Sequence, residues 1–87
     1  MRQITFSSEA FTDFVEWSTH NKKIFLKISK LIKETQRNPF DGTGEPEQLK
    51  HQFRGCWSRR ITIEHRLIYK VTDEMIKIIS CKFHYNG

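Results

Sequence analysis

Residues 56–85, CWSRRITIEHRLIYKVTDEMIKIISCKFHY, decide the fold, because apolar and polar residues alternate along much of this stretch. A period of two is typical of strands that bury one face and expose the other. We predict three strands, over residues 55–63, 65–72 and 75–84. Residues 72–74, TDE, have the composition of a tight turn and join the last two strands as a hairpin.

The same alternation divides the side chains of these strands between two faces. The face predicted to be buried carries Ile61, Ile63, Leu67, Tyr69, Val71, Ile79, Cys81 and Phe83. The opposite face carries Arg60, Arg66, Lys70, Lys82 and His84, with Ile68 among them, and we call it the basic face. Because its cations and one histidine are predicted to lie on a rigid sheet, the basic face is the candidate site.

The part of the chain before these three strands predicts one more strand and two helices. Residues 2–6 form a short strand, and a serine before Glu9 is a typical start signal for a helix over residues 7–19. A second helix is predicted over residues 22–38, where apolar residues recur at helical spacing and Pro39 ends the pattern. Its predicted buried stripe is Ile24, Ile28, Leu31, Ile32 and Thr35.

These elements predict an α+β fold of order βααβββ, with a small antiparallel or mixed sheet and two helices on one face. With 87 residues, the chain is expected to form a single domain, 1–87. Residues 38–52, rich in Gly, Pro and Asp, are expected to form a loop that is long for so small a domain. Loops of this length often carry function.

Charge points to a polyanionic partner. The chain has a net charge of +5, and its cations fall in two blocks separated by the acidic loop. Such a distribution is typical of nucleic-acid binding, although either block alone could be plain solvated surface. With no long apolar run and no leader-like start, we expect a soluble intracellular protein without an export signal and without a membrane partner.

Metal and thiol chemistry have little support in the sequence. Cys56 and Cys81 match no metal or redox spacing, and we expect reduced thiols. The four histidines, His20, His51, His65 and His84, lack the spacing of a zinc site, so we expect no metal and no cofactor. A loop carboxylate, a histidine and arginines are natural occupants of the base, acid and phosphate-binding roles in metal-free RNA cleavage. The basic face is compatible with either binding RNA or cutting it.

The stretches FDGTGEPEQLKH (40–51), GCWSRRITIEHRLIYKV (55–71) and FHY (83–85) resemble the YoeB/Txe toxins of the RelE/ParE superfamily. The resemblance extends to SEAFTDFVEW and LIKETQRNPF, and so covers nearly the whole chain. It implies a RelE-like microbial RNase fold and the toxin of a toxin–antitoxin module. Such toxins are ribosome-dependent endoribonucleases that cleave mRNA in the ribosomal A site and so inhibit translation. The implied partners are the ribosome with its rRNA, mRNA, a YefM-like antitoxin, operator DNA only through the antitoxin complex, and a possible second copy of the chain.

The resemblance also implies roles for individual residues. Glu47 matches the general base, His84 the general acid, and Arg66 the arginine that stabilises the transition state. The residues that match RNA-binding or positioning roles are Lys50, Arg60 and Tyr85. Each also has a structural alternative: Arg66 could pair with Glu64, and Tyr85 could pack inward. The alternative function is a non-catalytic toxin of the same fold that binds a protein target such as gyrase.

Overall fold

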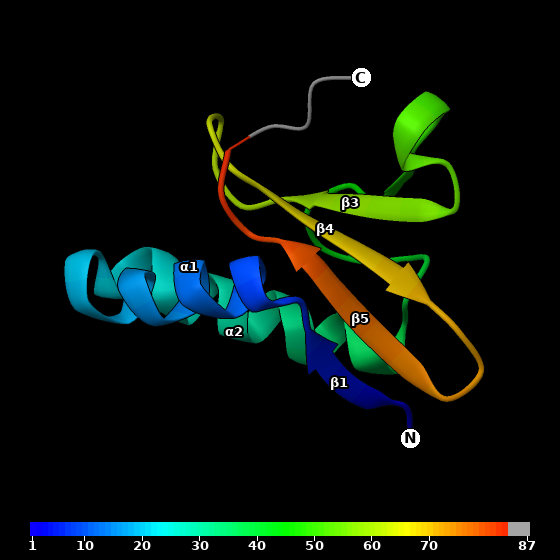
Figure 1. Cartoon of the computed structure of the whole chain (residues 1–87), viewed down its shortest axis with the longest axis horizontal. Coiled ribbons are helices and arrows are strands. Elements are labelled where there is room, and N and C mark those ends of the chain that lie inside the picture. The colour runs from blue at the N-terminus through cyan, green and yellow to red at the C-terminus, as the bar shows by residue number, and fades with distance from the viewer. Residues whose placement is uncertain (84–87) are drawn as a thin grey trace.

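Two helices pack on one side of a five-stranded sheet, in a computed structural model that describes residues 1–83 (Figure 1). The elements, in chain order, are β1 (Gln3–Phe6), α1 (Ser8–His20), α2 (Lys22–Arg37), β2 (Glu47–Gln48), the short 3-10 helix η1 (His51–Phe53), β3 (Cys56–Arg60), β4 (Arg66–Val71) and β5 (Met75–Ser80). The α+β class and the predicted order of helices and strands are confirmed. The short strand β2 was not predicted.

The sheet is mixed, with the strand order β1-β5-β4-β3-β2. Strand β1 pairs with β5 in parallel, and all other pairs are antiparallel. Strand β4 therefore occupies the centre, and β2 forms the edge next to β3. Strand β2 has only two residues and lies inside a Gly- and Pro-rich loop. It is therefore too short to show the alternation of apolar and polar residues from which a strand is predicted.

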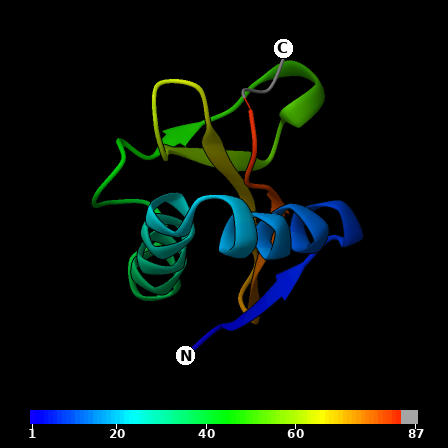
Figure 2. The same cartoon turned by 90° about the vertical axis from the view of Figure 1, so that its left-hand side faces the viewer.

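Local signals in the sequence account for both helices. Ser7 caps α1, because its hydroxyl oxygen accepts a hydrogen bond from the backbone N–H of Ala10 at 3.1 Å. Asn21 does the same for α2 through Ile24. The predicted stripe of α2 is confirmed, since its buried residues are Ile28, Leu31, Ile32 and Thr35, with Ile24 packed beside the core. Figure 2 shows the two helices side by side in front of the sheet.

The core lies between these helices and the sheet. Its fully buried members include Ala10 of α1, Ile28 of α2, Leu67 and Tyr69 of β4, and Ile76 of β5. Burial of apolar area at roughly 25 cal/mol per Å² is the main stabilising term in so small a domain. Neither helix in the described part of the chain has the length and apolar character needed to cross a membrane.

The prediction for the strand over 55–63 was too long, because β3 ends at Arg60. The hydroxyl oxygen of Thr62 accepts hydrogen bonds from the backbone N–H groups of Glu64 and His65, both at 3.1 Å, and so closes a tight turn. Ile63 lies in this turn and is 85% exposed. Its predicted inward position was wrong, because alternation no longer applies once the strand has ended.

The predicted inward position of Ile79 in the last strand was also wrong. Ile76 and Ile78 of β5 are fully buried in the core, whereas Ile79 is only partly buried. The pairing of β4 with β5 is irregular between Ile68 and Tyr69, which pair with Ser80 and Ile78, and this leaves Ile79 as the extra residue. A β-bulge of this kind reverses the facing of every later residue.

The strand over 75–84 ends early, at Ser80, and the next residues turn toward the helices. Cys81 is fully buried as predicted, but Phe83 is 59% exposed. The ammonium group of Lys82 lies 3.8 Å from a carboxylate oxygen of Glu16 and 5.9 Å from the ring centre of Trp17, both on α1. Lys82 therefore does not belong to the basic face.

Candidate active site

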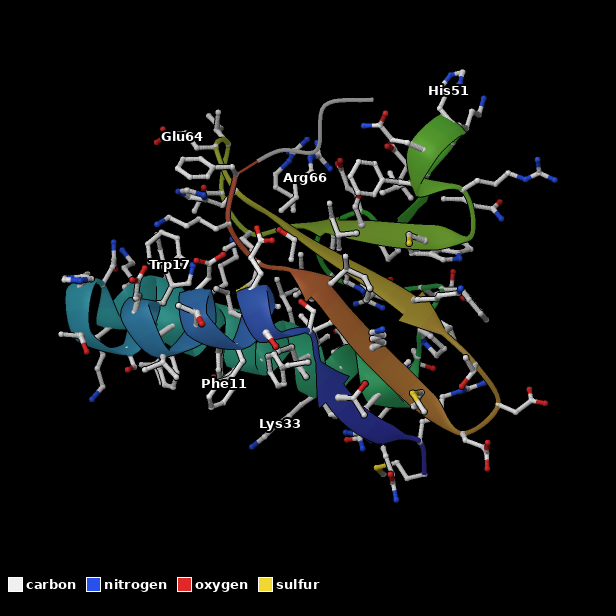
Figure 3. All side chains as sticks on the ribbon, in the orientation of Figure 1. Phe11, Trp17, Lys33, His51, Glu64 and Arg66 are labelled. Carbon is white, nitrogen blue, oxygen red and sulfur yellow. The ribbon has the colours of Figure 1, made fainter. Side chains whose placement is uncertain are left out.

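The strand register brings Glu47 to the face of the sheet that carries Arg60 and Arg66. Glu47 of β2 pairs with Ser58 of β3, and Ser58 pairs with Ile68 of β4. One step along the same face, Arg60 pairs directly with Arg66. Partners opposite one another in a ladder project to the same side, and residues two apart on one strand do as well. Figure 3 shows Arg66 on the side of β3 and β4 that faces away from α1 and α2.

The groups on this face are accessible. Glu47 is exposed, Arg66 is partly exposed, and Lys50 is exposed in the short segment between β2 and η1. Arg60 forms an ion pair with Glu45, with 3.4 Å between guanidinium nitrogen and carboxylate oxygen, at the surface. Such exposed pairs contribute only about 0–1 kcal/mol, so a phosphate could replace Glu45 at little cost. Among residues 1–83, no ion pair joins Arg66 to Glu64, the alternative considered for that arginine.

The centre of the basic face is less open than alternation predicts. Ile68 is 2% exposed, because it lies on the central strand between β3 and β5. Ser58 beside it is fully buried, and its hydroxyl has no hydrogen-bond partner in the described part of the chain. A buried hydroxyl therefore lies in the ladder position next to Glu47.

His84 and Tyr85 lie outside the described residues, so their predicted positions are not tested. The last described residue, Phe83, lies against the start of β4: its carbonyl oxygen accepts a hydrogen bond from the backbone N–H of Arg66 at 3.2 Å. The described chain thus ends beside one of the arginines of the basic face.

Sequence reasoning missed Arg59, which organises the loop that carries Glu47. Its side chain is fully buried on the helix side of β3, where it donates hydrogen bonds to backbone carbonyls of the loop. The acceptors are the carbonyl oxygens of Thr43 at 3.2 Å, Asp41 at 2.8 Å and Asn38, and the hydroxyl of Tyr69 accepts another from Nε at 3.2 Å. The inward phase of Arg59, shared with Trp57 and Ile61, could be read from the sequence, but its partners could not.

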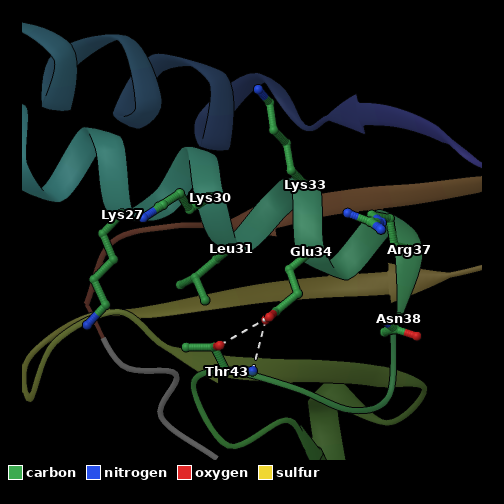
Figure 4. Close-up of a pocket in the computed structure, with 8 residues that line it drawn as sticks. All are labelled: Lys27, Lys30, Leu31, Lys33, Glu34, Arg37, Asn38 and Thr43. Carbon is green, nitrogen blue, oxygen red and sulfur yellow. Dashed lines mark hydrogen bonds between the residues drawn. The ribbon is translucent and has the colours of Figure 1, made fainter.

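Glu34 of α2 neutralises this buried arginine. Its carboxylate lies 2.6 Å from the Arg59 guanidinium and accepts hydrogen bonds from the N–H and hydroxyl of Thr43 (Figure 4). Desolvation tends to raise the pKa of Glu34, but the hydrogen bonds from Thr43 and the charge of Arg59 outweigh it, so the pKa lies below its usual value. Gly42, with φ of +122°, passes so close that an added Cβ would lie 2.9 Å from the Glu34 carboxylate.

A pocket of about 650 Å³ opens beside Glu34, between α2 and the loop. Its cationic lining consists of Lys27, Lys30, Lys33 and Arg37 (Figure 4). Glu47, Arg60 and Arg66 are not among its lining residues, so this pocket and the basic face are separate features. Within residues 1–83, no three His, Cys, Asp or Glu side chains gather in a group that could hold a metal ion.

Comparisons with known proteins give the family. The model of the "YoeB-like toxin of bacterial type II toxin-antitoxin system" matches residues 6–85. Toxin YoeB of Escherichia coli strain K12 is 49% identical over 83 residues, which cover 95% of this chain and 99% of that protein.

Two solved structures from Staphylococcus aureus agree with this. A YoeB dimer superposes with a TM-score of 0.90 at 48% identity, covering 97% of this chain and 98% of that chain. The toxin of a YoeB–YefM complex superposes with a TM-score of 0.88 at 49% identity, covering 98% and 99%. This chain belongs to the family of YoeB-like toxins of bacterial type II toxin–antitoxin systems.

Proposed function

We propose that this chain is an endoribonuclease that cleaves mRNA in the A site of the translating ribosome by metal-independent acid–base catalysis. The observation that carries the proposal is the register that brings Glu47 of β2, Arg60 of β3 and Arg66 of β4 to one face of the sheet. A base and two cationic phosphate ligands on three adjacent strands form a rigid surface for a phosphodiester.

In this mechanism, Glu47 takes the proton of a ribose 2′-hydroxyl, and the 2′-oxygen attacks the adjacent phosphorus. The bond from phosphorus to the 5′-oxygen breaks, and His84 gives that oxygen a proton. The products are a 2′,3′-cyclic phosphate and a free 5′-hydroxyl. Arg66 donates hydrogen bonds to the non-bridging oxygens as negative charge develops on them, a role that suits the planar guanidinium.

The spacing of the strands supports this division of roles. Glu47 and Arg66 are separated by two strand spacings across the sheet and by two residues along the strand direction. This corresponds to roughly 12 Å between their Cα atoms. Their long side chains can approach a phosphodiester and its ribose from two sides across that distance. Because both are held by strand pairing rather than by a mobile loop, little ordering is needed when RNA binds.

Binding and positioning of the RNA are proposed for Lys50, Arg60 and Tyr85. The cations around the pocket on α2 are suited to the phosphates of ribosomal RNA. By analogy with the YoeB–YefM complex and the YoeB dimer of Staphylococcus aureus, a YefM-like antitoxin would neutralise the toxin, and a homodimer is possible. Operator DNA would be bound only through the antitoxin complex, in the bacterial cytoplasm.

The test is primer extension on mRNA held by initiated bacterial ribosomes. We expect wild type to cut within the A-site codon, and Glu47→Gln and His84→Ala to cut at least about 100-fold more slowly, as loss of a proton-transfer group does. Glu74→Gln is the matched control, because Glu74 is an exposed carboxylate in the hairpin between β4 and β5. Equal cutting by Glu47→Gln and Glu74→Gln would refute the assigned roles.

A further inference from the structure

The end of the described chain is held in place by α1 and by the turn between β3 and β4. The indole N–H of Trp17 donates a hydrogen bond to the carbonyl oxygen of Cys81 at 3.0 Å. Two residues later, the backbone N–H of Phe83 donates to the Nδ1 atom of His65 at 2.8 Å. The carbonyl oxygen of the same Phe83 accepts from the N–H of Arg66 at 3.2 Å. The backbone N–H and carbonyl groups of Phe83 thus bind His65 and Arg66, two residues that are adjacent to each other in sequence.

His65 is itself rigidly held, so its nitrogen is a fixed acceptor. The side chain is almost fully buried, and its ring packs edge-on against Trp17 with 4.9 Å between ring centres. Its carbonyl oxygen accepts hydrogen bonds from Ile61 at 2.9 Å and Thr62 at 3.1 Å. Because Nδ1 faces an N–H donor, it acts as the acceptor of this hydrogen bond.

The backbone of Phe83 also indicates that this position is imposed by its surroundings. Its φ is +61°, in the left-handed region that residues other than glycine rarely adopt. Strained backbone of this kind persists only where neighbouring contacts enforce it, and it is common at functional sites. Around Phe83 these contacts are the His65 ring, 5.3 Å away between centres, and the Lys82 ammonium, 5.4 Å from the phenyl ring centre.

We propose that His65 is a positioning residue, which fixes Phe83, the residue that precedes His84 in the chain, beside Arg66. This inference rests on the proposed function, in which His84 supplies the proton to the leaving oxygen. Consecutive Cα atoms are only about 3.8 Å apart, so an error in the placement of Phe83 passes directly to the next residue. Misplacement of a reacting group by about 1 Å can cost about 100-fold in rate.

The decisive substitution is His65→Asn compared with His65→Leu. Asparagine places an acceptor oxygen close to where Nδ1 lies, whereas leucine fills similar space without an acceptor. Both remove the imidazole and its contact with Trp17, so a general loss of packing should affect them alike. His20→Leu is the control for removal of a histidine, because His20 is exposed in the last turn of α1.

Two measurements on the full chain test the proposal. The first is hydrogen exchange of the Phe83 amide, which we expect to be at least about tenfold faster in His65→Leu than in wild type or His65→Asn. The second is the kinetics of A-site cleavage. We expect kcat to fall about 10–100-fold in His65→Leu, with KM for the programmed ribosome changed less than about threefold, and most of kcat to return in His65→Asn.

Equal exchange of the Phe83 amide in all variants would show that the hydrogen bond does not hold the chain and would overturn the proposal. Equal loss of kcat in His65→Asn and His65→Leu, with their melting temperatures lowered alike, would reduce His65 to a packing residue and would also overturn it. If wild type does not cut at all, the proposed function fails and the positioning role falls with it. That result is distinguishable, because wild type and His20→Leu would then both be inactive.

Discussion

The guanidinium of Arg59 and the carboxylate of Glu34 meet at 2.6 Å, with the arginine side chain fully buried and the glutamate side chain 35% exposed. Through this pair, α2 and β3 together hold the loop over residues 38–43. Carbonyl oxygens of this loop accept further hydrogen bonds from the Arg59 guanidinium. The loop continues directly into β2 and Glu47. A buried charge on the helix side of β3 therefore supports the loop that leads to the proposed general base.

Removing this arginine should destabilise the protein strongly. Arg59→Met leaves the loop carbonyls without their donor and Glu34 without its counter-charge. Breaking a buried pair typically costs about 3–5 kcal/mol, and we expect ~3–4 kcal/mol here because Glu34 keeps some solvent. The measurement is the free energy of unfolding from urea titration. Arg54→Met is the control, since Arg54 is exposed, and a loss below about 1 kcal/mol for Arg59→Met would contradict the assigned role.

The same pair predicts a pH dependence of stability. The pKa of Glu34 in the folded protein lies below the unfolded value of 4.5, so the unfolded chain takes up this proton first as the pH falls. The stabilisation is therefore fully present above about pH 4.5 and is lost as the pH falls through the folded pKa. We expect the difference in unfolding free energy between wild type and Glu34→Gln to be constant near neutral pH and to shrink in acid. A difference that stays the same down to the acid range would argue against it.

The two cysteines should differ in reactivity. Both are free thiols, but Cys81 is fully buried and Cys56 is partly exposed. Burial, reinforced by Asp13 and opposed by Lys82, raises the pKa of the Cys81 thiol to about 12. Because the thiolate is the reactive form, iodoacetamide at neutral pH should label native protein at Cys56 and leave Cys81 unmodified. Native Cys56→Ser should take up no label and unfolded Cys56→Ser one; labelling of the native variant would show that Cys81 is accessible.

The hydroxyl of Ser58 has no hydrogen-bond partner within residues 1–83, and we therefore predict that the fold tolerates its removal. A buried hydroxyl without a partner costs about 1–3 kcal/mol relative to one that is hydrogen-bonded, and alanine lacks this group. We expect Ser58→Ala to unfold at the same temperature as wild type or at a higher one, measured by calorimetry. A clear fall in melting temperature would mean that the hydroxyl has a partner in the folded protein.

Elements with strong local signals were predictable from sequence. The capping serine of α1 was identified from a local start signal and the stripe of α2 from its helical periodicity, because both are patterns among residues close in sequence. For the same reason, alternation along the strands correctly assigned Arg60 and Arg66 to one face of the sheet.

Features that depend on distant residues were not predictable. The bulge at Ile79 depends on how β4 and β5 pair, and it removed Ile79 from the inward position that alternation predicted. The place of Glu47 depends on β2, which exists only because β3 offers it a partner. Arg59 was passed over because a charge at an inward position makes sense only once Glu34 and the loop are seen around it.

The central claim, that this face cleaves RNA through the 2′-hydroxyl, is tested most directly by changing the substrate rather than the protein. An mRNA with a single 2′-deoxynucleotide at the cleavage position should bind initiated ribosomes as the unmodified message does, yet remain uncut by the wild-type chain. The unmodified message should be cut there and should end in a 2′,3′-cyclic phosphate. Cleavage of the deoxy-substituted message at the same position and rate would contradict the mechanism assigned to Glu47, Arg66 and His84.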